Sequence, residues 1–180
     1  MATDGLTLEI TKIDAAHWQL RTAVKMWFHD DDPVSVHTLA FAAYEVAHFV
    51  SKARNPNRRD LLFDSDHIKS DKRNEFNQAF REAANFFKHA NRDPEGKIEF
   101  SPGLTELFIF FAIVGLELSG ICLSKELRVF IYQMQIRTPE LMSEDAQKMV
   151  AQSFLIENIK YLQALSKHEF FEACMHGLKD

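Results

Sequence analysis

The residues whose types and spacing best suit chemistry lie in the helical pattern of residues 70–93. A helix advances about 100° per residue, so side chains four positions apart, such as those of Asn85 and His89, are neighbours on one face. A histidine can exchange a proton near neutral pH, and an arginine or lysine stabilises the negative charge that develops during phosphodiester cleavage. The polar residues on this side of the helix form a row. Its candidate catalytic residues are Arg81, Asn85 and His89, and its candidate phosphate ligands are Lys88 and Arg92.

The other side of this predicted helix is apolar. Counted from Phe76 with the same helical advance, Phe80 and Phe87 fall within one arc, which also holds the alanines at positions 79, 83 and 90. We therefore expect the helix to bury this arc and to present the polar row outward. The alternative interpretation is an ordinary solvated helix face without a ligand.

An all-α chain with Asn-x-x-x-His in a mid-chain helix resembles the HEPN superfamily (higher eukaryotes and prokaryotes nucleotide-binding domain), over about residues 14–165. Many members are RNases or RNA-binding toxins. They work as dimers that bring together two copies of a motif in which an arginine, commonly followed by asparagine, precedes a histidine by a few residues. Asn85 and His89 match the Asn-to-His part of that motif. The resemblance implies a homodimer that binds RNA or a nucleotide.

The sequence departs from the family pattern at the arginine, whose place is taken by Ala84. Arg81 lies one turn earlier on the same helix face as His89 and is the candidate replacement. The missing arginine favours a binding or regulatory relative over an intact RNase. Whether the chain is an enzyme stays open. If it is an enzyme, the expected activity is that of a metal-independent RNase. The prediction is an RNA- or nucleotide-associated module with an incomplete RNase motif.

Two further groups of residues have competing interpretations. Glu45 and His48 form a Glu-x-x-His unit, with His37 three turns earlier, as in half of a di-iron site. A second copy of the unit is absent, so we favour histidines that hydrogen-bond within the core, and we predict no metal. Basic residues between positions 54 and 73 include Arg58 and Arg59 and could hold phosphates, but aspartates interleave with them. An ordinary charged loop is the favoured interpretation.

Composition favours one all-α domain. Of 180 residues, 46% are hydrophobic, and six Gly and five Pro leave little turn material for an all-β fold. The net charge of −5 argues against a protein that coats nucleic acid non-specifically. The charge is uneven, however, because residues 54–92 carry a net +3 and the remainder −8. A local basic surface on an acidic body is therefore expected.

The cysteines and the apolar segments bear on localisation. Cys122 and Cys174 stand in apolar helical contexts without a CxxC motif, which is typical of buried free thiols in a reducing compartment. The first residues show neither a basic start nor an apolar run. The most hydrophobic stretch, residues 107–116, is too short to span a bilayer. We predict a cytoplasmic protein with no membrane association and no cofactor.

Caps, proline breakers and periodicity predict a helical bundle of six to seven helices in a single domain over residues 1–180. An extended lead-in occupies residues 1–13, and a short C-terminal helix, begun by a Ser166–Glu169 capping box, lies within residues 166–180. The other helices are predicted at residues 14–29, 33–53, 70–91, 101–123, 125–136 and 143–165.

The aromatic content supports a second function. The sixteen phenylalanine side chains provide more aromatic surface than a small helical bundle readily buries. The alternative hypothesis is therefore a non-catalytic protein-interaction or dimerisation module with no nucleic-acid ligand.

Overall fold

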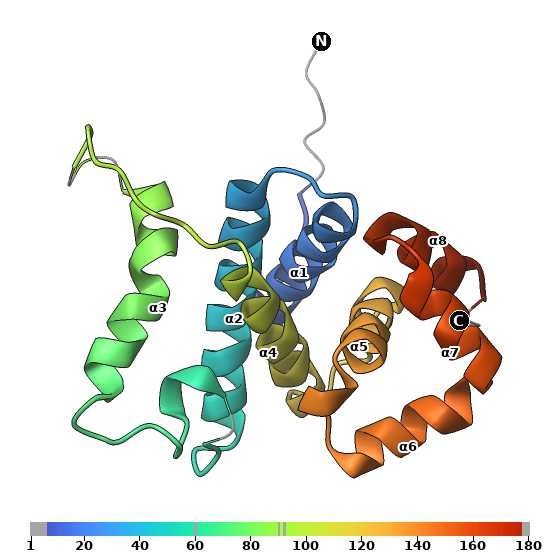
Figure 1. The fold of residues 1–180 in the computed structure, drawn as a ribbon. Helices are drawn as coiled ribbons and strands as arrows, with labels where there is room; N and C mark the ends of the chain where they lie inside the picture. Colours follow the sequence, from blue (N-terminus) through green and yellow to red (C-terminus); the bar gives the residue numbers. More distant parts are fainter. Residues whose placement is uncertain (1–6, 60, 90, 92, 178–180) are drawn as a thin grey trace.

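The computed structural model describes residues 7–59, 61–89, 91 and 93–177 and confirms the all-α class. These residues form eight α-helices and two short 3-10 helices, and no β-strand (Figure 1). The helices are α1 Lys12–Phe28, α2 Pro33–Arg54, α3 Arg73–Lys88, α4 Leu104–Leu118, α5 Lys125–Arg137, α6 Glu144–Ser153, α7 Ile156–Ala164 and α8 Lys167–Gly177; the 3-10 helices are η1 Leu62–Asp64 and η2 Pro139–Leu141.

Local sequence signals explain where α1 and α2 begin. Thr11 and Asp14 form a reciprocal capping box, so α1 begins at Lys12, slightly before the predicted start. The Asp32 carboxylate accepts hydrogen bonds from the backbone N–H groups of Val34 and Ser35, and proline occupies the first position of α2. The short connection between these helices therefore reverses the direction of the chain, and α2 packs against α1.

The core is centred on α1, α2 and α4, which lie side by side in the middle of the molecule (Figure 1). Three alanines of α2, at positions 40, 43 and 47, are fully buried and let neighbouring helices approach closely. A Cβ added at Gly115 of α4 would lie 2.9 Å from the Ala47 Cβ. Small residues on both helices thus set the α2–α4 separation.

The prediction of one helix over residues 143–165 is wrong. Phe154 and Leu155 have extended backbone angles and separate α6 from α7, which raises the number of helices to eight. The Phe154 ring packs edge-on against Tyr132 of α5 at 5.0 Å between centroids. The bend lets both short helices lie against α5. The predicted capping box at Ser166 and Glu169 is confirmed and opens α8.

Two smaller predictions also need correction. The helix predicted at residues 70–91 is shorter, because α3 begins at Arg73 and ends at Lys88, and the residue before it makes no side-chain capping bond. Cys122 is exposed, so only Cys174 is the buried free thiol that we expected. Burial raises the pKa of the Cys174 thiol to about 11. In the part of the chain that the structure describes, no helix has both the length and the apolar character needed to cross a membrane.

Candidate functional site

Helix α3 stands at the edge of the molecule, beside α2 and η1 (Figure 1). Ala84 is its one buried residue among those described, whereas Phe76, Phe80 and Phe87 are half-buried. The Phe80 ring contacts Phe108 of α4 at 5.6 Å between centroids. By the helical advance, Ala84 lies about 80° from Phe76. The helix is therefore rotated about its axis relative to the predicted orientation, which placed the phenylalanine arc at the centre of the contact.

This rotation turns Arg81 and Lys88 toward α2 rather than outward. The Arg81 guanidinium lies 4.1 Å from the centroid of the Phe63 ring, and its Nε donates to Glu45 Oε1 at 3.3 Å. The Lys88 ammonium lies 5.3 Å from the centroid of the Phe41 ring. Cation–π contacts let such side chains cover aromatic surface while they keep their charge. The expectation of one outward row is thus wrong for these two residues.

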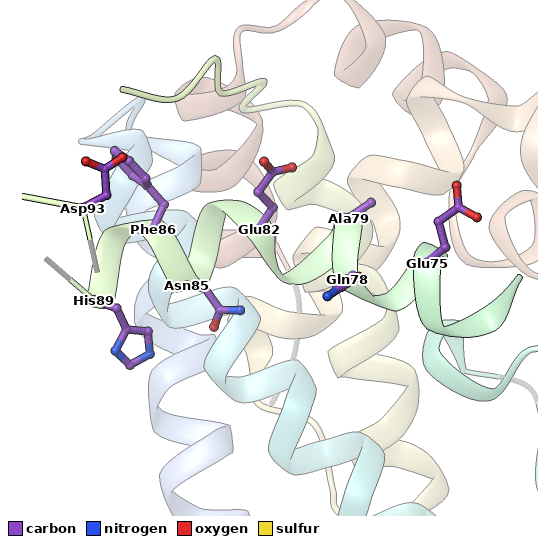
Figure 2. Close-up of a pocket in the computed structure, with 8 residues that line it drawn as sticks. All are labelled: Glu75, Gln78, Ala79, Glu82, Asn85, Phe86, His89 and Asp93. Carbon is purple, nitrogen blue, oxygen red and sulfur yellow. The ribbon is translucent and has the colours of Figure 1, made fainter. Parts of the chain in front are cut away.

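Asn85 and His89 instead line an open hollow of about 510 Å³ on the outer side of α3, which we call the outer hollow. Its lining includes three carboxylates, from Glu75 and Glu82 of α3 and from Asp93 on the segment after it. In Figure 2 the Glu75 and Glu82 side chains point to one side of α3, and the Asn85 and His89 side chains point to the other. Carboxylates at this density repel phosphate groups. The structure places Arg81 in another pocket, apart from Asn85 and His89, and Arg92 lies outside the described residues.

A second hollow, of about 280 Å³, lies where the end of α2, η1 and α3 meet; we call it the basic pocket. Its lining combines four cations, one carboxylate, one histidine, one amide and two aromatic rings. These residues are Lys52, Arg59, Arg73 and Arg81, with Asp64, His48, Asn77, Phe49 and Phe63. Among the members of the predicted row that the structure describes, Arg81 alone belongs to it.

Hydrogen bonds hold the segment around η1 in place between the two helices. The Tyr44 hydroxyl of α2 accepts a hydrogen bond from the Phe63 N–H at 3.0 Å. The Asn77 amide of α3 donates to the Phe63 carbonyl, also at 3.0 Å. The Arg73 guanidinium donates to the carbonyl oxygens of Ser65 and Ile68. The pocket is therefore built on a backbone that both helices position, which favours a preformed site.

The floor of the basic pocket is a buried ion network. Asp64, 7% exposed, accepts from His48 Nε2 at 3.2 Å and pairs with Lys52 Nζ at 2.8 Å. Burial lowers the pKa of His48, although the Asp64 carboxylate opposes this shift. His48 is therefore neutral at pH 7, and because its Nε2 carries the proton, its Nδ1 bears the lone pair. That Nδ1 is buried and has no hydrogen-bond partner among the described residues.

The charges that remain in the basic pocket favour an anion. Asp64 is already shared by Lys52 and His48. The Arg59 and Arg73 guanidinium groups donate to backbone carbonyl oxygens, and among the described residues neither is paired with a carboxylate. Phe49 is 55% exposed beside these groups. Guanidinium groups bind phosphate oxygens in a bidentate manner, and an exposed ring offers a stacking surface for a base.

The residues that resemble half of a di-iron unit on α2 each have a separate partner among the described residues. His37 Nδ1 lies 2.9 Å from Thr105 Oγ1, Glu45 is paired with Arg81, and His48 with Asp64. Each residue thus has a separate partner, as the interpretation of hydrogen-bonded core histidines predicts. Burial, with a smaller contribution from the Lys88 charge, lowers the pKa of His37 to about 4.

The basic residues at the end of α2 and after it have diverse roles. Arg54 donates to the Ser119 carbonyl and ties the end of α2 to the end of α4. Arg59 and Arg73 do join one site, as the phosphate-binding interpretation required, but Lys52 and Asp64 complete it and were missed. The signal available in the sequence was the spacing of His48 and Lys52, which stand four residues apart and so share one face of α2.

Comparison with known proteins gives no match to a family model, to a curated protein or to a solved structure.

Proposed function

We propose that the protein is an RNA- or nucleotide-binding module whose phosphate site is the basic pocket. The observation that carries the proposal is the gathering of four cations around one carboxylate, next to the exposed Phe49 ring. A phosphate monoester or diester would take bidentate hydrogen bonds from the guanidinium groups, and a neighbouring base would stack on Phe49. Stacking of this kind contributes about 1–3 kcal/mol per base in single-stranded RNA binding.

Binding without cleavage fits the arrangement of titratable groups. Asn85 and His89 lie on the acidic outer hollow, away from the cations that would stabilise a cleavage transition state. His48 lines the basic pocket, but its free nitrogen is buried and cannot reach a ribose hydroxyl. We therefore propose a binding or regulatory role, as expected of a HEPN-like homodimer in which the motif arginine is replaced by Ala84.

The test is a titration of labelled single-stranded RNA, and separately of nucleotides, followed by fluorescence anisotropy. Arg59→Glu reverses the charge of an exposed pocket residue without removing a buried contact, and Lys160→Glu makes the same charge change on the exposed side of α7. We expect about tenfold weaker binding in Arg59→Glu, about 1.4 kcal/mol, and unchanged binding in Lys160→Glu. Equal affinities for both variants would contradict the proposal, because they would place the ligand elsewhere.

Salt dependence gives a second readout of the same titration. Each phosphate neutralised by Lys or Arg adds about 0.7 to the slope of log affinity against log salt for single strands. We expect Arg59→Glu to have a shallower slope than the parent protein. RNA length is measured on the same samples, so that cleavage, which we do not expect, would be detected directly.

A second candidate function, self-association or binding of another protein, is supported by the outer face of α4. Along this face Leu104 is 48% exposed and Leu107 is 37% exposed. Phe111, Val114 and Leu118 continue the same stripe and are half-buried. An apolar helix stripe left open in this way is typical of an interaction surface. A homodimer through α4 would shift to monomer in Leu107→Asp, as measured by light scattering, and a monomeric parent protein would exclude it.

A further inference from the structure

We infer that His29, His168 and Glu172 form a site for a divalent transition metal ion of the Zn²⁺ class, which joins the end of α1 to α8. One potential ligand atom of each residue lies within 4.8 Å of those of the other two. Ligand atoms around a tetrahedral Zn²⁺ ion are roughly 3.3 Å apart, so small side-chain rotations close the site. Imidazole nitrogen and carboxylate oxygen are the ligands that such ions accept, with a fourth position left for water.

The two ligands from α8 have the spacing that a helix needs for chelation. His168 and Glu172 stand four residues apart, one turn along the same face. The Ser166–Glu169 capping box begins α8 at Lys167, so His168 belongs to a well-formed first turn. The Glu172 side chain is 47% exposed, which leaves its carboxylate accessible to an ion from solvent.

The third ligand is oriented by a bond of the kind that supports metal-binding histidines. His29 Nδ1 lies 2.7 Å from the Lys25 carbonyl oxygen. A carbonyl oxygen can only accept a hydrogen bond, so Nδ1 carries the proton and Nε2 of the neutral ring bears the lone pair. The His29 and His168 rings are in edge contact, with centroids 4.7 Å apart. The ring contact thus holds the His29 imidazole beside His168 of α8.

Contacts that do not involve the ligands keep the ends of α1 and α8 together. The Lys167 ammonium donates to the Trp27 carbonyl at 3.2 Å and forms an ion pair with Asp30. The Phe28 and Phe171 rings pack with centroids 4.8 Å apart. The protein therefore brings the three ligands near one another without metal, so little ordering of the chain opposes binding. A bound ion would add a link between residues far apart in sequence.

The test is a calorimetric titration of the tag-free protein with Zn²⁺, with a thermal unfolding scan on each sample. We expect one site per chain, and a rise in Tm of roughly 3–10 °C at a ten- to hundredfold excess of Zn²⁺ over Kd. His168→Ala and Glu172→Gln should each lower the affinity by about tenfold or more. His67→Ala removes an exposed histidine of the loop after η1 and should leave the affinity unchanged.

Glu172→Gln keeps the size and polarity of the side chain, so it tests coordination even where His168→Ala disturbs the start of α8. Absence of Zn²⁺ binding by the parent protein at millimolar concentration would overturn the inference. Binding that is unchanged in both His168→Ala and Glu172→Gln would also overturn it, because the ion would then occupy another place.

Discussion

The His37 side chain illustrates how far the surroundings of a single residue can be predicted from the sequence. It is 2% exposed and lies among the rings of Phe41, Phe87, Phe100 and Phe108. The sequence predicted a buried histidine with a hydrogen-bond partner but offered no means to name Thr105, which is 68 positions away. Periodicity identifies the face of a helix on which a side chain lies, whereas its partner depends on tertiary packing.

The lowered pKa of His37 predicts a pH-dependent stability. The unfolded state takes up a proton near pH 6.5, whereas the folded state resists it down to about pH 4. The free energy of unfolding should therefore fall as the pH is lowered from 6.5 toward 4, by up to about 3 kcal/mol from this residue. Urea unfolding at several pH values measures it, with His37→Gln as the variant that lacks the titrating group.

Between pH 6.5 and 4.5 the parent protein also carries a contribution from His48, whose pKa burial lowers as well, so the difference between the parent protein and His37→Gln isolates the contribution of His37. Glu126 is a buried carboxyl whose pKa is also strongly shifted, but over a lower pH range. Burial alone would raise its pKa, but its own backbone N–H and hydrogen bonds from Arg21 and Lys25 lower the pKa to about 2. Its stabilising contribution is present above pH 4.5 and is lost between 4.5 and 2. Parallel stability curves for the parent protein and His37→Gln above pH 4.5 would contradict the assignment to His37.

At the scale of the helices, sequence signals located most elements but not their rotation. Caps and prolines gave starts for α2 and α8 that agree with the structure. The orientation of α3 was wrong because the largest apolar residues were taken as the centre of its contact. The small Ala84 lies there instead, and Arg81 covers the Phe63 ring. An arginine stacked on an aromatic ring occupies part of a buried face without counting as hydrophobic.

The bend between α6 and α7 was missed for a related reason. Phe154 and Leu155 fit the apolar pattern of a continuous helix, and neither Gly nor Pro marks a break. At the break, the Phe154 ring packs against Tyr132 on another helix. Tertiary packing here outweighs local helix propensity.

The close α2–α4 contact gives a prediction at this scale. A leucine at Gly115 cannot fit, since its Cβ alone would lie 2.9 Å from the Ala47 Cβ and 3.4 Å from the Ala47 carbonyl carbon. Gly115→Leu should therefore lower stability by about 2 kcal/mol or more, seen as a fall in Tm of roughly 4–10 °C.

Gly103→Leu is the matched control, because an added Cβ there has its nearest neighbour at 4.0 Å. Its Tm should stay within about 2 °C of the parent protein, as for most exposed substitutions. Equal effects at the two positions would show that the α2–α4 distance adjusts freely, contrary to the packing described.

At the scale of the whole molecule, charge is distributed unevenly. Residues 54–92 carry a net +3, and the rest of the chain a net −8. The sequence predicted this basic region but assigned the candidate phosphate ligands, Lys88 and Arg92, to the Asn85–His89 row. The structure gathers the cations instead where α2, η1 and α3 meet, from residues up to 29 positions apart. Spacing along one helix could not have predicted a pocket that three elements assemble.

The most direct test of the central claim compares the two hollows beside α3 in one RNA titration. Arg59→Glu alters the basic pocket, and the double variant Asn85→Ala/His89→Ala alters the outer hollow. We predict that RNA affinity falls about tenfold in Arg59→Glu and is unchanged in the double variant. Loss of binding in the double variant, with Arg59→Glu unaffected, would contradict the claim and return the site to the Asn85–His89 face.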